Sequence, residues 1–502
     1  MQAWPLSNRG AVILHALLVL TIAWGALAFG AVYTWAYWPL AIACAICGAS
    51  AVIATAGANV QGVSRGLVTA LVVVAAAIGL QLVPLPARVL SAISPSMAPL
   101  TGRLSPAFAA GLQPTHAVSV WPRDTAVALI LYASFALLCS GLVSLFNMTG
   151  ARRFVEWLTG FGALLAIIGF AQKSFSSRYL YGFWELEAGR TPFGPFVNRN
   201  HFAGWMVMAL PLTLGLLVAG IDHGVRVRRG WHHRLLWFAS PEANRLMLAA
   251  LAAVLMALSL MLTMSRSGIT AFGLSMIVTG WFVSQSVRSR SRRIVATTCL
   301  VLLVATVIVW SGPEVIASRF AAADWGEFNN RKGAWLDAWS VARAFPLVGT
   351  GVNTYWAAAL FYQQHDMSYF FGQAHNDYLQ LAAEGGLLVT VPAIACLLVF
   401  VRDVRRSLYQ SRGEASWWLR AGAVASVIAM GFQETVDFSL QMPGNAALFA
   451  AVCAVALHNP PSKSQADENT AAAPSEVPRS RSLRIVEPPR VRQDWSNAPD
   501  HP

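Results

Sequence analysis

The sequence predicts an all-α, polytopic membrane protein. Of its 502 residues, 56% are hydrophobic and only 12% are charged, and the mean hydropathy is +0.53. Soluble domains carry about 25% charged residues. The apolar runs are about 20 residues long, which suits membrane-spanning helices, and they lack the alternation of barrel strands. We therefore expect a helix bundle within a membrane.

The lengths of the apolar runs predict about twelve spans. They cover 11–31, 36–56, 66–84, 124–146, 153–172, 201–220, 244–264, 267–286, 294–311, 377–401, 417–437 and 442–458. The first run follows Arg9 and contains Ala26-Leu27-Ala28, so it also has the outline of a cleaved signal peptide. Because many spans follow, an uncleaved first span is the preferred interpretation.

Arginine in the short loops sets the expected orientation. These arginines are Arg65, Arg152, Arg153, Arg226, Arg228, Arg229, Arg234, Arg288, Arg290, Arg292, Arg293, Arg402, Arg405, Arg406 and Arg412. By the positive-inside rule these loops and both termini lie in the cytoplasm, and the longer segments 85–122, 173–200 and 312–376 lie outside. The net charge of +13 is spread over loops and tail. It indicates orientation and contact with anionic lipid rather than binding of nucleic acid.

The transmembrane domain is expected to cover residues 1–458. Residues 459–502 are rich in Pro, Ser and Arg and are expected to form a disordered cytoplasmic tail. Small and aromatic residues recur at helical spacing in the outer segment 312–376, and they are Ala334, Trp335, Ala338, Trp339, Ala342 and Phe345. They predict an amphipathic helix that lies on the bundle, opened by Arg331 and Lys332 and ended by Pro346.

A polar stretch that begins at His375 precedes a long apolar run. Asn376 or Asp377 is a natural N-cap for the following helix. Asp377, Gln380 and Glu384 have the spacing of one helical face. Glu384 lies about 10 Å below Asp377, where a carboxylate is costly against lipid, so this face is expected to line the protein interior or a wet cavity. His375 lies at the helix start, where free backbone N–H groups favour an anion.

Two arginine motifs belong to the same outer side. Arg266, in Ser265-Arg266-Ser267-Gly268, joins two apolar runs with almost no loop. It is either a snorkelling arginine at the membrane edge or a cation aimed at a phosphate. Arg331 and Lys332 are either solvated charges or phosphate ligands, and the planar fork of arginine binds two oxygens at once.

A third motif, Asn198-Arg199-Asn200-His201, comes directly before a span. Asn200 either caps the helix or, with Arg199, holds sugar hydroxyls or a phosphate. Glu434 and Asp437 are three residues apart near the outer end of a later span and are expected to face inward.

No metal or cofactor is expected. The six cysteines all lie within apolar runs and are interpreted as buried thiols rather than disulfides or zinc ligands. The spacing of His365, Asp366, His375 and Asp377 fits no compact metal motif. There is also no nucleophile-elbow sequence for a serine hydrolase.

Five segments occur in an order that resembles a known family. They are Phe196-Val197-Asn198-Arg199-Asn200-His201-Phe202-Ala203, the Ser-Arg-Ser-Gly motif at Arg266, Arg331 with Trp335 and Trp339, Gly349-Thr350-Gly351-Val352-Asn353-Thr354-Tyr355, and His375-Asn376-Asp377-Tyr378-Leu379. Together they resemble the O-antigen ligase family of bacterial inner-membrane proteins, which includes related polysaccharide polymerases. The motifs cover about 190–390.

The resemblance implies a metal-independent, inverting glycosyltransferase of the GT-C type. Such an enzyme moves a glycan from undecaprenyl pyrophosphate to an acceptor hydroxyl at the periplasmic face. Family arginines that hold the pyrophosphate correspond to Arg266 and Arg331, and the essential histidine corresponds to His375. A further family arginine has two candidates here, Arg190 and Arg199, with no firm match. The supporting or substrate-binding candidates are Asn200, Asn353, Tyr355, Asn376, Asp377 and Glu384.

The implied chemistry suits these residue types. Cations in a low-dielectric cleft stabilise the charge of a departing pyrophosphate. Histidine supplies a base with a pKa near neutrality for a weakly nucleophilic hydroxyl. From helical spacing, Glu384 or Asp377 is expected to orient His375.

The sequence leaves the acceptor open. A ligase transfers to a sugar of lipid A-core, whereas a polymerase transfers to another lipid-linked repeat unit, and we place the ligase first. Buried charge on a helical bundle also marks transporters. Against transport, the polar groups cluster near the outer edge, and no inverted pair of broken helices is evident.

Overall fold

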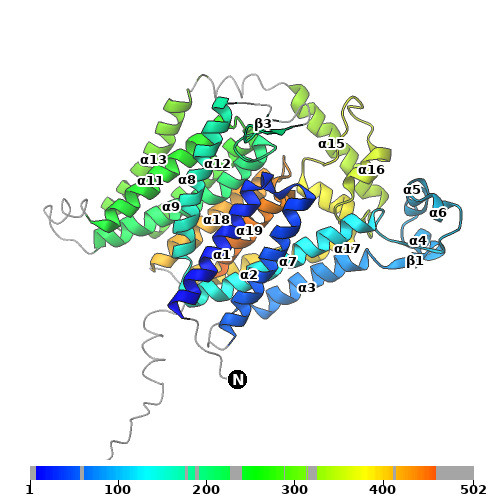
Figure 1. The fold of residues 1–502 in the computed structure, drawn as a ribbon, viewed down its shortest axis with the longest axis horizontal. Coiled ribbons are helices and arrows are strands. Elements are labelled where there is room, and N and C mark those ends of the chain that lie inside the picture. The colour runs from blue at the N-terminus through cyan, green and yellow to red at the C-terminus, as the bar shows by residue number, and fades with distance from the viewer. Residues whose placement is uncertain are drawn as a thin grey trace, which may run out of the picture. The chain divides into compact units, whose positions relative to one another are not determined.

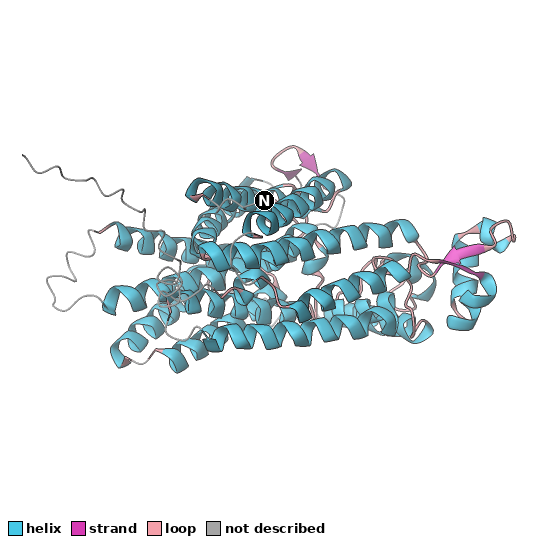
Figure 2. Ribbon diagram, turned by 90° about the horizontal axis from the view of Figure 1, so that it is seen from below, coloured by secondary structure: helices cyan, strands magenta, loops and turns pink. Residues whose placement is uncertain are grey.

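The computed structural model describes residues 7–56, 62–175, 179–186, 191–226, 240–287, 289–312, 314, 325–410 and 414–459. The expected tail beyond Asn459 and the candidate Arg190 lie outside these ranges. In the described part, helices form the bundle, and the strands form two small two-stranded sheets (Figure 2).

Each of the twelve predicted spans coincides with a helix. They are α1 (Asn8–Leu27), α2 (Thr34–Thr55), α3 (Arg65–Leu80), α7 (Pro122–Thr149), α8 (Arg152–Phe175), α9 (Arg199–Arg226), α11 (Pro241–Leu262), α12 (Arg266–Ser286), α13 (Arg290–Ser311), α17 (Asp377–Gln410), α18 (Ala415–Gln433) and α19 (Pro443–Leu457). Short 3-10 turns, η1 (Phe29–Ala31) and η2 (Ser439–Gln441), follow α1 and precede α19.

Eight of these helices are long and apolar enough to cross a membrane: α1, α2, α7, α8, α9, α11, α12 and α17. Residues 65–80 and 443–457, and residues 293–306 of α13, are shorter apolar helices. The chain is therefore an all-α, polytopic membrane protein, as the composition predicted.

The helix α9 is the centre of the bundle. It packs against α8, α11, α12 and α18 (Figure 1). Its side chains from His201 to Leu216 are buried on every face. Helix α18 crosses it closely because two glycines meet there. A Cβ at Gly215 would lie 2.4 Å from the carbonyl oxygen of Trp418, and a Cβ at Gly422 would lie 2.4 Å from that of Pro211. This packing fixes the helix ends at which the outer motifs lie.

The segments 85–122, 173–200 and 312–376, called the outer segments after their expected side of the membrane, add small elements of their own. They are β1 (Pro84–Pro86), α4 (Ala87–Ile93), α5 (Met97–Leu104), α6 (Pro106–Ala109), β2 (Thr115–Ala117), β3 (Tyr179–Leu180), β4 (Trp184–Glu185), α15 (Trp325–Ala344) and α16 (Tyr355–Tyr362). Strand β1 pairs with β2, and β3 pairs with β4, both antiparallel. Buried apolar residues of α4, α5, α15 and α16 share one core, so the first and third outer segments fold together (Figure 1).

The predicted amphipathic helix is α15, with two corrections. Ala334, Ala338 and Phe345 are buried as predicted, but Trp339 is 51% exposed and faces away from the core. The helix also begins at Trp325, so Arg331 lies within it rather than at its start. Arg331 is therefore not at the helix N-terminus, where a cation would oppose the helix dipole.

Candidate functional site

A break in α17 is the scaffold of the site. Gly386 has φ +53°, which interrupts the helix, and the segment 346–351 docks along the break. The backbone N–H groups of Leu387 and Leu388 donate to the carbonyls of Pro346 and Leu347 at 2.8 and 2.9 Å. A Cβ at Gly386 would lie 2.4 Å from the nitrogen of Gly349, so glycine is required where the two backbones meet.

Glu384 holds the segment that follows. Its carboxylate accepts hydrogen bonds from the backbone N–H groups of Asn353 and Tyr355, both at 2.8 Å. Gln380 donates a third, at 3.1 Å. Glu384 is 5% exposed and faces the protein interior, as its helical spacing predicted. Its partners show that it positions the 353–355 segment rather than His375.

Gln81 completes this scaffold and had no signal in the sequence. Its side chain, at the end of α3, is fully buried. It donates to the carbonyls of Val348 and Glu384, at 2.7 and 2.9 Å, and accepts from the N–H of Val352 at 3.0 Å. One amide thereby joins three segments that are far apart along the chain.

His375 lies just before α17 and is held by its backbone. Its φ is +52°, a conformation that costs a non-glycine residue of order 1–3 kcal/mol and that clusters at functional sites. Its carbonyl accepts from Trp335 Nε1 at 3.1 Å. The ring meets Phe371 and Phe438 edge to face, with centroids 6.0 and 4.8 Å away. Its Nδ1 is buried with no hydrogen-bond partner among the described residues.

This environment keeps His375 neutral. Burial, with the positive charge of Arg331 in addition, lowers the pKa of His375 to about 4. The sequence analysis expected a value near neutrality. A neutral imidazole at physiological pH retains the lone pair that a general base requires, although its basicity is reduced.

Asn376 and Asp377 bind other segments. Asn376 caps α17 by accepting from the N–H of Leu379 at 3.0 Å, and its amide donates to the carbonyl of Thr435 at 2.9 Å. Asp377 accepts from Gln441 Nε2 at 2.6 Å. The sequence thus predicted the cap correctly, but neither Asp377 nor Glu384 has a hydrogen bond to His375 in the structure.

Arg331 connects His375 to a buried carboxylate. It donates from Nη1 to the carbonyl of Val436 at 3.0 Å, and its charge acts on both His375 and Asp437. Asp437 lies beyond α18 and is fully buried. Burial raises its pKa, while the charge of Arg331 and hydrogen bonds lower it. Asp437 and Glu434 therefore face inward, as predicted.

Asp437 also contacts the motifs that contain Arg266 and Asn200. Ser267, beside Arg266, donates to its carboxylate at 3.1 Å, and the side chain of Asn200 also hydrogen-bonds to it. Arg266 opens α12 and is half-buried, and Arg199 opens α9 with its N–H bonded to the carbonyl of Thr191 at 2.7 Å. Four motifs that are distant in sequence thus meet around Asp437 and His375.

A cavity of about 690 Å³ lies on the polar face of α17. Asp377, Gln380, Glu384, Asn353 and Gln441 contribute polar groups to its lining. Helix α7 adds the carboxylate of Asp124, and most of the other lining residues of α7 and α19 are apolar. No Lys or Arg is among the described residues that line it. The predicted polar stripe therefore faces a cavity. Tyr355, in contrast, is 2% exposed and belongs to the core of the outer segment.

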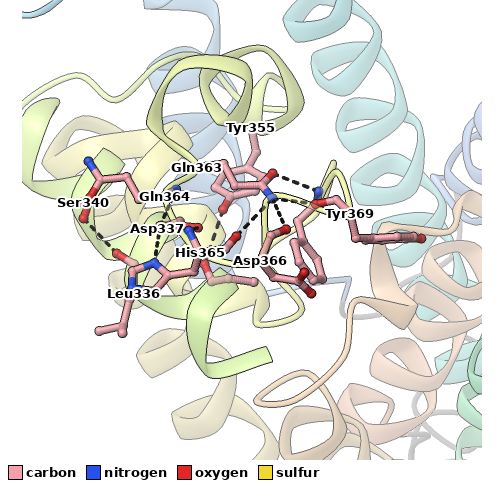
Figure 3. A network of polar contacts seen from close by, with 11 residues as sticks. Leu336, Asp337, Ser340, Tyr355, Gln363, Gln364, His365, Asp366 and Tyr369 are labelled. Carbon is pink, nitrogen blue, oxygen red and sulfur yellow. Dashed lines mark hydrogen bonds and ion pairs between the residues drawn. The ribbon is translucent and has the colours of Figure 1, made fainter. Parts of the chain in front are cut away.

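A second histidine lies close to this region but has a different environment. His365 Nδ1 is 2.7 Å from Asp337 Oδ1, and Asp337 also accepts from the N–H groups of Gln364 and His365 (Figure 3). Asp337 is 3% exposed, whereas the His365 side chain is 46% exposed. The sequence analysis considered His365 only as a metal ligand. No group of three potential metal ligands occurs in the described ranges.

Comparison with known protein families finds a match in the middle of the chain. Residues 251–394 match the family model described as O-Antigen ligase, Wzy_C. No curated protein matches the chain. The matched range contains Arg266, Arg331, His375 and Glu384, while Asn200 and Asp437 lie outside it. The resemblance stated from the sequence is therefore confirmed for this part of the chain: residues 251–394 of this multi-pass membrane protein match an O-antigen ligase domain.

Proposed function

We propose that the protein is a periplasmic-face glycosyltransferase that moves a glycan from undecaprenyl pyrophosphate to an acceptor hydroxyl. The observation that carries this proposal is the neutral His375 beside Arg331, in a cluster that also contains the Arg266 motif. A base and cations at the end of a membrane bundle suit a phosphate leaving group carried on a lipid. Under this proposal both termini are cytoplasmic.

In the proposed reaction, His375 accepts the proton of the acceptor hydroxyl. The hydroxyl oxygen forms a bond to the anomeric carbon, and the bond from that carbon to the pyrophosphate oxygen breaks. The electron pair leaves with the lipid pyrophosphate, whose charge Arg331 and Arg266 stabilise. Attack from the side opposite the leaving group inverts the anomeric configuration, and the mechanism needs no metal or cofactor.

The cavity on the polar face of α17 is the proposed acceptor side. Its wall holds carboxylates and amides without a cation, which suits neutral sugar hydroxyls better than phosphate. The apolar residues of α7 that line it, such as Leu131 and Phe135, offer a surface for the lipid that anchors the acceptor. Donor charge and acceptor hydroxyl would then approach His375 from different sides.

The preferred acceptor is lipid A-core, and the alternative is a second lipid-linked repeat unit. A strain that lacks this gene separates the two. Under the ligase proposal, polymerised repeats remain on the undecaprenyl carrier and lipid A-core carries none. A core that carries a single repeat supports the polymerase. Normal glycans in both fractions would contradict both assignments and leave transfer of another exported glycan, and after it transport, as the alternatives.

A further inference from the structure

A groove lies at the end of the bundle opposite His375, between α12, α17 and α18. Its volume is about 620 Å³. Arg405 and Arg406 contribute to its wall from the last turns of α17, the helix that begins beside His375. At about 1.5 Å per residue, up to about 40 Å of α17 separates Asp377 from Arg405, more than the thickness of a hydrocarbon core of about 30 Å. The groove therefore belongs to the other membrane face.

The charge of the groove is one-sided. Arg405 and Arg406 are exposed and form no ion pair with any residue that the structure describes. None of the described residues in the wall is acidic. The nearest acidic residue along α17, Asp403, is paired with Arg402 at 2.9 Å. Within the described residues, the groove thus presents two cations without an acidic partner.

Aromatic residues form most of the remaining wall, which also includes Gln285, Ser286 and Leu408. Trp281 and Tyr409 are 56% and 74% exposed, which places their rings on the outer surface of the bundle. Trp417 is buried below them, with its ring 5.6 Å from that of Phe282 and its Nε1 donating to the carbonyl of Leu408 at 3.1 Å. Exposed Trp and Tyr at helix ends are typical of the membrane–water interface.

We propose that this groove binds an anionic phospholipid. Arg405 and Arg406 hold the phosphate, because a guanidinium fork binds two phosphate oxygens at once. An acyl chain lies along Trp281 and Phe282. Basic pockets between spanning helices commonly take lipid headgroups. A free phosphate ion would use the arginines but leave the aromatic wall without a role. This site is distant from the glycan site, so it does not depend on the proposed transfer reaction.

Binding to the purified full chain tests the proposal. Phosphatidylglycerol is titrated into the detergent-solubilised protein, with phosphatidylcholine of the same acyl chains and inorganic phosphate as comparisons, and adducts are followed by native mass spectrometry. We expect phosphatidylglycerol to bind and to raise the Tm, and the R405Q/R406Q double variant to bind it about 10- to 30-fold more weakly. Arg402→Gln is the matched control, because Arg402 lies on the same helix but is already paired, and it should bind as the parent does.

A second variant protects the test against a folding defect. Gln285→Glu places a negative charge in the same wall while both arginines remain. It should weaken phosphatidylglycerol binding while leaving phosphatidylcholine binding unchanged. Equal binding of phosphatidylglycerol and phosphatidylcholine, or parent-like binding by both variants, would overturn the proposal. A shift with inorganic phosphate as large as that with phosphatidylglycerol would show an ion site and not a lipid site.

Discussion

His375 and His365 lie ten residues apart in sequence and have opposite environments. The His365 ring is half-exposed and paired with the buried Asp337, an arrangement often associated with catalytic histidines. The His375 ring lies between phenylalanine edges, and its Nδ1 has no hydrogen-bond partner among the described residues. If a carboxylate partner were the only criterion, His365 and not His375 would therefore be chosen as the base.

The surroundings of each ring favour the opposite choice. Arg331 and Trp335 are one turn apart on α15 and face the His375 region. Gly333 and Asp337 are also one turn apart and contact His365, and a Cβ at Gly333 would lie 2.7 Å from the Cβ of His365. Two residues correspond to about 200° around a helix, so the two histidines lie on opposite faces of α15. Of the two histidines, only His375 lies on the face of α15 that carries Arg331.

The largest expected effect comes from replacing each of the two histidines in turn. His375→Ala should lower glycan transfer by about 10²- to 10⁴-fold, because a general base is lost. His365→Ala is the matched control and should keep transfer within about threefold of the parent, since surface changes away from a site have small effects. Transfer is measured as polysaccharide attached to lipid A-core in a complemented deletion strain, with protein abundance measured in the membrane fraction. The reverse pattern would make His365 the base.

The cations give the next largest effect. Arg331→Lys keeps the charge but loses the planar fork, and it should lower transfer by about 10- to 100-fold. Lys332→Ala changes the neighbouring, exposed cation on α15 and should leave transfer unchanged. The same comparison applies to Arg266→Lys. Full activity of Arg266→Lys would indicate a simple membrane-edge anchor, the alternative that the sequence left open.

Local sequence patterns correctly predicted the features that depend on local interactions, namely the helices and the faces they bury. Apolar run length located a helix at each of the twelve predicted spans, eight of which are long and apolar enough to cross a membrane. Helical spacing correctly placed Gln380 and Glu384 toward the interior. The same spacing could not identify the partners of Glu384, because these are backbone groups of Asn353 and Tyr355 brought in by a docked segment. Gln81 was missed for a similar reason: a lone amide at a helix end acquires its role only from three long-range contacts. The start of α15, which lies at Trp325 and not at Arg331, was also misjudged.

The pH dependence of transfer tests whether the charge of Arg331 controls the protonation of His375. With a pKa of about 4 in the free protein, His375 is neutral above that pH and becomes protonated as pH falls through it. The acid limb of kcat/KM should therefore lie near pH 4, well below the ordinary histidine value of about 6.5. A bound pyrophosphate offsets the charge of Arg331, so the acid limb of kcat should move to higher pH. In Arg331→Gln the acid limb of kcat/KM should also move to higher pH. An unchanged pH profile would show that the charge of Arg331 does not act on His375.

The smallest effect on transfer is expected at Asp337, where stability should change instead. Asp337→Asn keeps the side-chain shape but weakens the bonds that hold the 363–365 segment on α15, and it should cost about 1–3 kcal/mol of stability. The Tm of the purified protein should fall, while transfer per folded molecule should stay within about threefold of the parent. His365→Ala combined with Asp337→Asn should cost little more than Asp337→Asn alone, since residues in one contact are coupled. A loss of transfer without a fall in Tm would instead show that the Asp337–His365 pair takes part in the transfer reaction. The two histidines would then no longer differ in function.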